Sequence, residues 1–461
     1  MISSLCFFQV SHYIFFQMIL QRILRDINVH QFRFSSKSAL FVSGKNAQKQ
    51  FAVFTPKICV DWVKSNRTTL ETVNQARKVS LDVGNLIHEL ETYQALKVQI
   101  QEDRGNLEQI HLELSERKKR GEDVSDFTRK LKEIKKEMNV EAKKESISNF
   151  EESSVLDYLN LQNCNANSRL SEKPYYCMRR EENKFNKINH RELCLNNDLI
   201  EFSPNSHSAY YLKGQLAHLE LKLGHFFTSK LLASGLEIFS NPDFVKSVLA
   251  EGAGLDIFEA SKIFALKKYQ DFGDRSSCNA VHLVGGASLA AFSGYFSRNI
   301  VMTPQVLPAL MFCVGRLYSP LSSAQTDLLS CQQSQALQVL GLTTDQLAME
   351  TQLQSLLNII SQIFSSFPNL TITEVSLEDC ERSNSRQFRL EVEGVETVTI
   401  GHVGVQDSYL SDRMMMVTAD NSPLFTVSAN INITRLMAVM LELAQDSEAA
   451  IQWDLIDSWL A

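Results

Sequence analysis

Two short segments contain the small polar side chains that decide what chemistry this chain can perform. Residues 285–288 read Gly-Gly-Ala-Ser, and residues 311–316 read Met-Phe-Cys-Val-Gly-Arg. The neutral Ser288 hydroxyl cannot replace a carboxylate that pairs with an ammonium ion, because a charge-assisted hydrogen bond contributes about 1.5–3 kcal/mol. Arg316 follows Cys313 by three positions, and an odd shift along a strand points its side chain to the opposite face. Apart from Arg316, these two segments therefore carry only neutral side chains, whereas a reaction on charged substrates needs charged side chains to hold them.

The cysteines and His402 do not suggest a metal site or a catalytic base. Nine cysteines are scattered and never form Cys-x-x-Cys, which argues against a disulfide framework and a structural zinc site. Scattered thiols suit a reducing compartment and are mostly small buried apolar groups. His402 lies in an apolar strand context, which favours a packed or hydrogen-bonded histidine. The sequence predicts no metal ion and no cofactor.

Length and charge limit the classes of protein to consider. A chain of 461 residues suggests two or three domains, and 44% hydrophobic with 21% charged residues is ordinary for a globular protein. The net charge is −7, so an RNA contact must come from a local basic patch. We expect no DNA binding.

Residues 1–55 have the composition of a mitochondrial presequence. Asp26 is the only acid before Asp61, and an amphipathic apolar face follows Met18. The apolar stretch 5–20 is an alternative signal anchor, but it is short for a membrane span and is interrupted by polar residues. Met18 is an alternative start to Met1. We therefore predict import into the mitochondrial matrix and no membrane span; the basic residues are Arg22, Arg25, Arg33, Lys37, Lys45 and Lys49.

Residues 56–145 are predicted to form an antiparallel helical hairpin after a short helical lead-in over 56–80. Apolar residues recur every three or four positions over 86–114 and again over 124–138, which places each set on one helix face. Gly121 supplies the turn. At 1.5 Å per residue, a longer arm of about thirty residues spans roughly 45 Å.

Basic residues gather at the tip of this hairpin and on its second helix. Interleaved acids such as Glu113 and Glu116 favour an ion-paired, solvated surface, and RNA binding is the alternative. The candidates for RNA contact are Arg117, Lys118, Lys119, Arg120, Arg129, Lys130 and Lys132.

The remainder is predicted to be a linker at 146–185 and an α+β core at 186–461. The linker is polar and aperiodic, and a helix is expected from Tyr210 to about Gly235. Many short strands with few crossover helices indicate a mostly antiparallel sheet flanked by helices. The expected strands cover 280–284, 309–314, 370–375, 388–392, 397–400, 413–417 and 424–427.

The order of these motifs resembles the seryl-tRNA synthetases, which are class II aminoacyl-tRNA synthetases. Tyr-Leu-Lys-Gly at 211–214 matches the entry into the synthetase core, and Gly235 with Pro242 resembles the dimerisation motif. The segment 434–442 keeps the arginine that binds ATP, here Arg435, and the helix after it. The resemblance covers the chain from the hairpin to the last helix. It implies a tRNA-binding arm and a dimeric synthetase core.

The same resemblance shows where this chain departs from the family. The family's Thr-x-Glu serine site corresponds to Gly286-Ala287-Ser288, its Phe-Arg-x-Glu to Phe312-Cys313-Val314-Gly315, and a Ser-Ser pair to Gly401-His402. Losing two or three charged groups at roughly 3 kcal/mol each lowers the rate by about 10⁴–10⁷. Arg435 either still contacts a nucleotide or forms a cap or an ion pair within the core. The positions without the family's functional residues include Gly286, Ser288, Cys313, Gly315, Gln338 and Thr399.

Three hypotheses follow from this combination. The favoured one is a catalytically inactive mitochondrial paralogue that forms a heterodimer with the active mitochondrial seryl-tRNA synthetase and supports aminoacylation of tRNA(Ser) and mitochondrial translation. The second is a divergent active aminoacyl-tRNA synthetase, which would show ATP–pyrophosphate exchange dependent on Arg435. The third is a mitochondrial RNA-binding or regulatory protein that acts outside aminoacylation and needs the basic residues of 117–136.

Overall fold

The structure is a computed structural model that describes most of the chain after residue 55. No described helix is long and apolar enough to cross a membrane. The described residues are 38–40, 56–76, 79–120, 143, 146–147, 149–151, 153–165, 167–169, 171–178, 188–203, 210–259, 261–266, 280–298, 307–320, 327–446 and 450–461.

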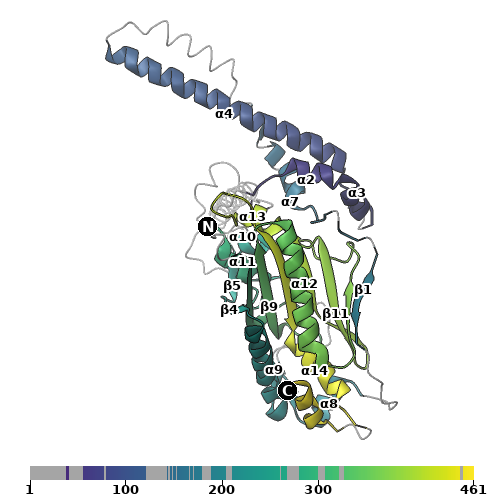
Figure 1. The fold of residues 1–461 in the computed structure, drawn as a ribbon. Helices are drawn as coiled ribbons and strands as arrows, with labels where there is room; N and C mark the ends of the chain where they lie inside the picture. Colours follow the sequence, from purple (N-terminus) through teal and green to yellow (C-terminus); the bar gives the residue numbers. More distant parts are fainter. Residues whose placement is uncertain are drawn as a thin grey trace, which may run out of the picture.

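A long helix projects away from the rest of the molecule (Figure 1). Helix α4 (Val83–Lys119) has 37 residues, so its length is about 56 Å at 1.5 Å per residue. Helices α2 (Val60–Ser65) and α3 (Arg67–Ala76) precede it, which confirms the helical lead-in. The helix that the apolar spacing predicts over 86–114 is confirmed. The predicted second helix at 124–138 lies outside the described residues.

The base of α4 is anchored to the core by apolar packing. Leu90 is fully buried together with Val63 and Leu70, and this cluster continues into Val375 and Leu377 of the core. Burial of such side chains contributes roughly 1.5–3 kcal/mol each. The heptad residues beyond Ile100 are only half-buried, so tertiary packing supports the base of the arm more than its outer part.

The predicted linker is partly structured, which corrects the expectation for 146–185. It contains α7 (Ser154–Leu159) and β1 (Lys173–Cys177), and β1 pairs antiparallel with a strand of the main sheet. The segment between them is polar because its amides serve the core: buried Asn163 donates to the carbonyls of Ser383 and Gln406. Hydrogen bonds of this kind leave no apolar periodicity to detect in the sequence.

The core is built on an eight-stranded sheet in the order β1-β10-β11-β12-β13-β9-β8-β4. All neighbours are antiparallel except β4 and β8, which confirms the predicted α+β class. Two small sheets accompany it, β2-β3 and β5-β7-β6. The strands are β2 (Ile200–Phe202), β3 (Tyr210–Leu212), β4 (Glu237–Ile238), β5 (Phe244–Lys246), β6 (Phe264–Ala265), β7 (Val281–Leu283), β8 (Ala309–Tyr318), β9 (Gln333–Thr343), β10 (Leu370–Glu374), β11 (Arg386–Glu393), β12 (Thr397–Asp407) and β13 (Phe425–Asn432).

Helices α9, α12 and α14 cover one face of the large sheet (Figure 1), and their apolar side chains form the main core with alternate strand residues such as Phe312, Val339 and Ala429. A second cluster, which includes α10 and α11, packs on the other face near β8 and β9. The helices of the core are α8 (His190–Asn196), α9 (Gly214–Ala233), α10 (Ser247–Gly252), α11 (Leu289–Phe296), α12 (Gln346–Ile363), α13 (Tyr409–Met414), α14 (Ile433–Leu443) and α15 (Trp453–Trp459).

Three predicted elements differ from the structure. The strand expected at 413–417 was wrong, because residues 409–414 form α13, where the Arg413 guanidinium lies over the Tyr409 ring one turn earlier. The helix expected from Tyr210 begins at Gly214, after β3. The central strand β9 was not predicted, because its nearly continuous burial leaves no alternation to detect.

Candidate functional site

A row of polar side chains crosses the sheet on the face opposite α9, α12 and α14. The strand register places Cys313 beside Gln338, Gln338 beside Asn430, Asn430 beside His402, and His402 beside Arg389. Directly paired residues in antiparallel strands share a face, so the row runs across β8, β9, β13, β12 and β11. This face brings together Cys313, Gln338 and His402, which are far apart in the sequence.

The first part of the row is neutral and already hydrogen-bonded. Gln338 is buried, its amide donates to the Val339 carbonyl at 3.0 Å, and its oxygen accepts from the Asn430 amide at 3.1 Å. The Asn430 amide also donates to Ala287 O at 3.4 Å. Burial raises the pKa of the Cys313 thiol, so it remains protonated near neutral pH. None of these groups supplies a fixed charge.

The far end of the row carries a cation that sequence reasoning missed. The Arg389 guanidinium lies 3.6 Å from a carboxylate oxygen of Glu172 and 3.7 Å from one of Glu391. Glu391 also accepts a hydrogen bond from the Thr399 hydroxyl at 3.4 Å. The alternation of Arg389 and Glu391 along β11 was a usable signal for a charged strand face, but Glu172 comes from the predicted linker. Two carboxylates therefore already surround this cation.

His402 is a half-buried surface histidine of this face. Its Nε2 lies 3.6 Å from a carboxylate oxygen of Glu381. That His402 is a packed or hydrogen-bonded histidine and not a catalytic base stays a prediction.

The loop 285–288 is held tightly against β8. Gly285 adopts φ +91°, the left-handed region that favours glycine, and its N–H donates to Asp243 O. The Gly286 N–H donates to the Asp243 carboxylate at 2.8 Å. The Ser288 hydroxyl accepts from Ala291 N at 3.2 Å and thereby caps α11. This capping hydrogen bond gives the serine at position 288 a structural role.

Two of the glycines in the matched positions leave no room for a side chain. A Cβ on Gly286 would lie 2.8 Å from Asn241 O, and a Cβ on Gly401 would lie 2.1 Å from Asn430 O. Both distances are to backbone oxygen atoms, which cannot move like the end of a flexible side chain. Gly315 differs, because a Cβ there would make ordinary contacts, the nearest at 3.4 Å from Ala287 N. The backbone is therefore fitted to the glycines at 286 and 401.

Arg435 and Arg316 are both engaged by the protein itself. The Arg435 guanidinium donates to Leu329 O at 2.9 Å and to Thr399 O at 3.3 Å. Arg316 pairs with Glu220 of α9 at 2.9 Å, on the opposite face from Cys313, as the three-residue spacing predicts. The alternative that Arg435 serves the core thus has direct contacts in its favour.

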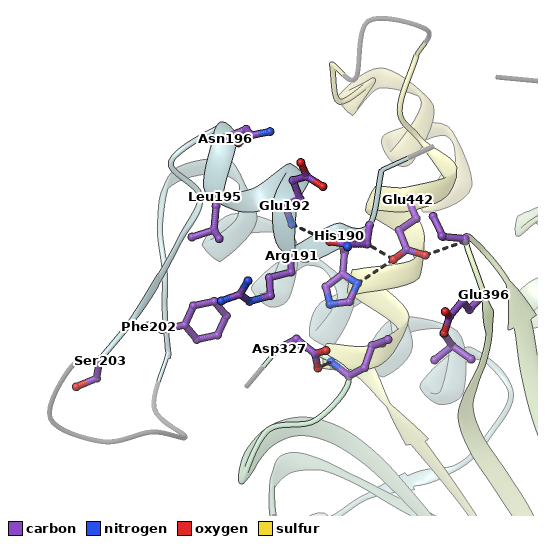
Figure 2. A pocket seen from close by; sticks show the side chains of 14 residues that line it. His190, Arg191, Glu192, Leu195, Asn196, Phe202, Ser203, Asp327, Glu396 and Glu442 are labelled. Atoms are coloured by element: carbon purple, nitrogen blue, oxygen red, sulfur yellow. Dashed lines mark hydrogen bonds and ion pairs between the residues drawn. The ribbon is translucent and has the colours of Figure 1, made fainter. Parts of the chain in front are cut away.

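A cavity of about 840 Å³ lies at the end of α14, away from the polar row (Figure 2). Buried His190 donates its N–H to Glu442 and places Nδ1 2.8 Å from the same carboxylate oxygen, while Val395 N donates to the other oxygen. These hydrogen bonds outweigh burial and lower the pKa of Glu442. The pair ties α8 to α14, so its first consequence is structural.

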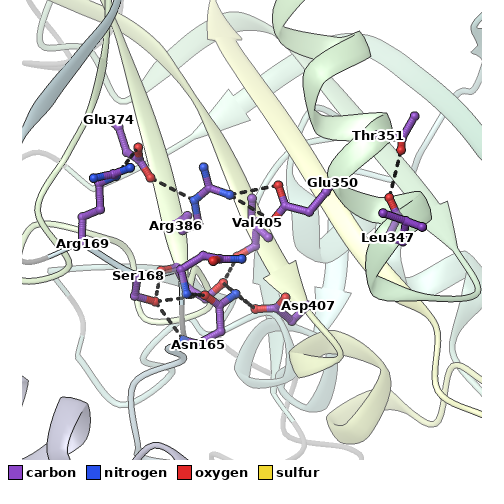
Figure 3. A network of polar contacts seen from close by, with 12 residues as sticks. Asn165, Ser168, Arg169, Leu347, Glu350, Thr351, Glu374, Arg386, Val405 and Asp407 are labelled. Carbon is purple, nitrogen blue, oxygen red and sulfur yellow. Dashed lines mark hydrogen bonds and ion pairs between the residues drawn. The ribbon is translucent and has the colours of Figure 1, made fainter.

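A second polar network attaches part of the segment that was predicted as a linker to the sheet (Figure 3). Arg386 donates to Glu374 at 2.9 Å and to Glu350 of α12 at 3.0 Å. Asn165 donates to the Asp407 carboxylate at 2.8 Å. Burial raises the pKa of Asp407, which the hydrogen bonds only partly offset. Each of these charged groups has partners inside the network, which holds α12 and the segment around Asn165 against the sheet, and Asn165 and Asp407 also line a second cavity of about 390 Å³.

The predicted dimerisation residues lie at one edge of the sheet. Gly235, with φ +84°, ends α9 and leads into the edge strand β4, and Pro242 is exposed between β4 and β5. Their neighbours Ile238 and Phe244 are 51% and 53% exposed. Large apolar side chains at a sheet edge are typical of surfaces that another protein covers.

The basic candidates on the arm are only partly described. Arg117 lies 3.3 Å from Glu113 and Arg120 lies 3.6 Å from Glu116, both one helical turn away and exposed. Lys118 and Lys119 lie in or beside this last turn of α4. Arg129, Lys130 and Lys132 lie outside the described residues. The described ion pairs agree with a solvated charged surface and leave its cations accessible.

Comparison with known proteins shows where this fold occurs. The chain aligns with a seryl-tRNA synthetase from Pyrococcus horikoshii, solved with ATP, at a TM-score of 0.71 and 13% identity, covering 87% of this chain and 98% of that one. It aligns with a cytoplasmic serine–tRNA ligase from Naegleria fowleri, solved with AMP, at a TM-score of 0.70 and 12% identity, covering 87% and 97%. These alignments show that the chain has the seryl-tRNA synthetase fold.

Sequence similarity is weaker and shorter. The chain is 27% identical over 136 residues to a serine–tRNA ligase from Borrelia recurrentis, which is 28% of this chain and 30% of that relative. No protein-family model matches.

Proposed function

We propose that this protein is a seryl-tRNA synthetase-like subunit that has lost adenylation and acts by association with an active synthetase. The observation that carries the proposal is the fitted backbone at Gly286 and Gly401. The resemblance places functional side chains there, and backbone oxygen atoms occupy the space that a Cβ needs. The shared fold supports descent from a seryl-tRNA synthetase, and the lack of space at Gly286 and Gly401 supports the loss of adenylation.

The charges near the polar row support the same conclusion. Adenylation gathers negative charge on phosphates and is stabilised by several cations and a carboxylate-held magnesium ion. Arg389 lies between two carboxylates, and Arg435 is hydrogen-bonded to backbone carbonyls. A phosphate would have to displace the backbone hydrogen bonds of Arg435, and the two carboxylates beside Arg389 would repel it.

The proposed partner is the active mitochondrial seryl-tRNA synthetase, in a heterodimer within the matrix. Exposed Ile238 and Phe244 beside the predicted dimerisation residues support an interface at the β4 edge. The basic, acid-poor segment before residue 55 supports mitochondrial import. The projecting α4 supports a contact with tRNA(Ser), because a rigid arm reaches beyond the core (Figure 1).

Two measurements test this proposal. Calorimetric titration with ATP and with a seryl-adenylate analogue, together with ATP–pyrophosphate exchange over the amino acids, should show neither binding nor exchange. Exchange that disappears in Arg435→Ala would instead establish a divergent active synthetase.

Association is tested separately by affinity purification from mitochondria. The proposal expects the active seryl-tRNA synthetase in stoichiometric amount and reduced serylation of tRNA when this chain is depleted. Recovery of homodimers alone, with serylation unchanged, would contradict the heterodimer.

A further inference from the structure

The short segment Ser38–Leu40, near the N-terminal end of the chain, is packed inside the core. Ser38, Ala39 and Leu40 are only 1%, 3% and 0% exposed. They lie against α10 (Ser247–Gly252), more than 200 residues later in the sequence. These three residues fall within the 1–55 segment whose composition predicts a removable presequence. A segment that is removed from the mature protein does not need to be buried in its core.

The polar contacts of this segment converge on one buried carboxylate. Glu251 accepts hydrogen bonds from the Ser38 hydroxyl at 2.6 Å, Ala39 N at 2.5 Å and Leu40 N at 3.3 Å. Burial raises the pKa of Glu251, and these donors together with the nearby Arg413 charge offset part of that effect. A buried carboxylate that loses its donors bears an uncompensated desolvation penalty.

The apolar contacts point the same way. Ala39 and Leu40 belong to the cluster that contains Val248, Ala250 and Met414. Leu40 reaches within 3.7 Å of the position that a Cβ on Gly252 would occupy. Removing Leu40 would leave a cavity in a close-packed region. Hydrogen bonding and packing therefore both require the segment.

We infer that Ser38–Leu40 remains in the mature protein, because the targeting segment is cut on the N-terminal side of Ser38. The step is hydrolysis of one peptide bond among the first 38 residues: water adds across the bond, leaving a carboxylate on the released peptide and an ammonium on the mature chain. The inference rests on the mitochondrial location proposed above. It replaces the boundary at residue 55, which composition alone suggested, with one that the core of the protein imposes.

Three truncated chains, which begin at residues 35, 38 and 41, test the structural part outside mitochondria. A chain that begins at residue 38 should keep the thermal unfolding midpoint of a chain that begins at residue 35, which is the matched three-residue control. A chain that begins at residue 41 should unfold at a lower temperature or fail to accumulate as soluble protein. Equal midpoints for the chains beginning at 38 and 41 would overturn the inference.

A substitution at the acceptor separates the carboxylate contacts from the packing of Leu40. In the Glu251→Ala background, the decrease in midpoint caused by removing residues 38–40 should be smaller than in the wild-type background. A decrease of the same size in both backgrounds would show that the hydrogen bonds to Glu251 do not hold the segment.

N-terminal sequencing of the protein purified from mitochondria tests the processing part. We expect the mature chain to begin at or before Ser38. A mature chain that begins after Leu40 overturns the inference. An unprocessed chain found outside mitochondria overturns the proposed location and the cleavage with it, while the truncation pair still decides whether Ser38–Leu40 belongs to the core.

Discussion

At the scale of single residues, several side chains at the positions matched to the synthetase family form contacts that hold the fold together. Ser288 caps α11, Gln338 accepts a hydrogen bond from Asn430, and Arg435 donates to two backbone carbonyls, so these three matched residues form structural contacts. Replacing Ser288 or Gln338 by the side chain that the synthetase family has at that position would therefore remove a structural contact. Gly401 shows this most directly, since the resemblance places a serine at this position.

We expect Gly401→Ala to be strongly destabilising. Its Cβ would lie 2.1 Å from Asn430 O, and overpacking of this kind costs about 1–3 kcal/mol or more. The measurement is urea unfolding followed by circular dichroism. The matched control is Gly105→Ala in α4, where nothing lies within 4 Å of the new Cβ and the helix should gain about 1 kcal/mol. Equal effects at the two positions would contradict the fitted backbone at 401.

The Glu442 carboxylate should make stability depend on acid pH. Burial alone would raise its pKa, but the hydrogen bonds from His190 and Val395 lower the pKa below its ordinary value of 4.5. The folded state therefore binds fewer protons than the unfolded state, so the contribution is complete above pH 4.5 and is lost as pH falls through the lowered pKa.

Urea unfolding at a series of pH values from neutral downwards measures this contribution. Glu442→Gln should be less stable than wild type at neutral pH and should lose less stability below pH 4.5. Exposed Glu396→Gln in the same cavity is the control and should follow the wild-type curve. A Glu442→Gln curve parallel to wild type would rule out this carboxylate as the source of acid sensitivity.

At the scale of elements, α4 combines a packed base with an exposed outer part. Its base shares an apolar cluster with the core, whereas Leu112 near the outer end is 68% exposed. An element of this kind keeps its direction while its tip remains free to contact another molecule. The ion pairs at Arg117 and Arg120 are exposed, and exposed pairs contribute only about 0–1 kcal/mol, so a phosphate can compete for these cations.

Replacing Arg117, Lys118, Lys119 and Arg120 by alanine should weaken tRNA binding. The affinity for tRNA falls as the salt concentration rises. Removing one contact to a phosphate reduces the slope of log affinity against log salt concentration by about 0.7–0.9. Titration at several salt concentrations therefore measures how many of the four cations meet phosphate. Lys222→Ala is the control, because this exposed lysine pairs with Asp457 on the core. An unchanged slope would identify the tip as solvated surface.

At the scale of the whole molecule, the β4 edge and the arm are separate surfaces on one scaffold. The large sheet ends in the two-residue strand β4, where Ile238 is exposed, and Phe244 is exposed on β5 of the three-stranded sheet. Short edge strands limit uncontrolled pairing, and exposed apolar side chains favour a specific partner. The β4 edge and the outer part of α4 thus both expose apolar side chains that another molecule could cover.

Charged substitutions at this edge should abolish association without unfolding the chain. We expect Ile238→Glu with Phe244→Glu to shift the protein to monomer in size-exclusion chromatography with light scattering, because a desolvated carboxylate opposes burial in an interface. Leu347→Glu is the control, since Leu347 is 79% exposed on α12. Retention of the assembly by the edge variant, with circular dichroism unchanged, would place the interface elsewhere.

Local patterns in the sequence were enough to predict the long helix and most strands of the sheet. Heptad spacing depends on neighbours three and four residues apart, and a missing Arg or Glu is visible from the residue type alone. The same reasoning failed at 146–185 and at β9. Polar hydrogen bonds to the core support the first segment, and burial on both faces removes alternation from the second.

The sequence by itself determined the class of fold and which charged groups are absent at the matched positions. Only the tertiary structure decided that Gly286 and Gly401 have no space for side chains, that Arg389 lies between Glu172 and Glu391, and that Ser38–Leu40 is core. The physical reason is the same in each case. These properties arise from atoms of residues distant in the chain that come within a few ångströms only when the sheet, its helices and the N-terminal segment have packed.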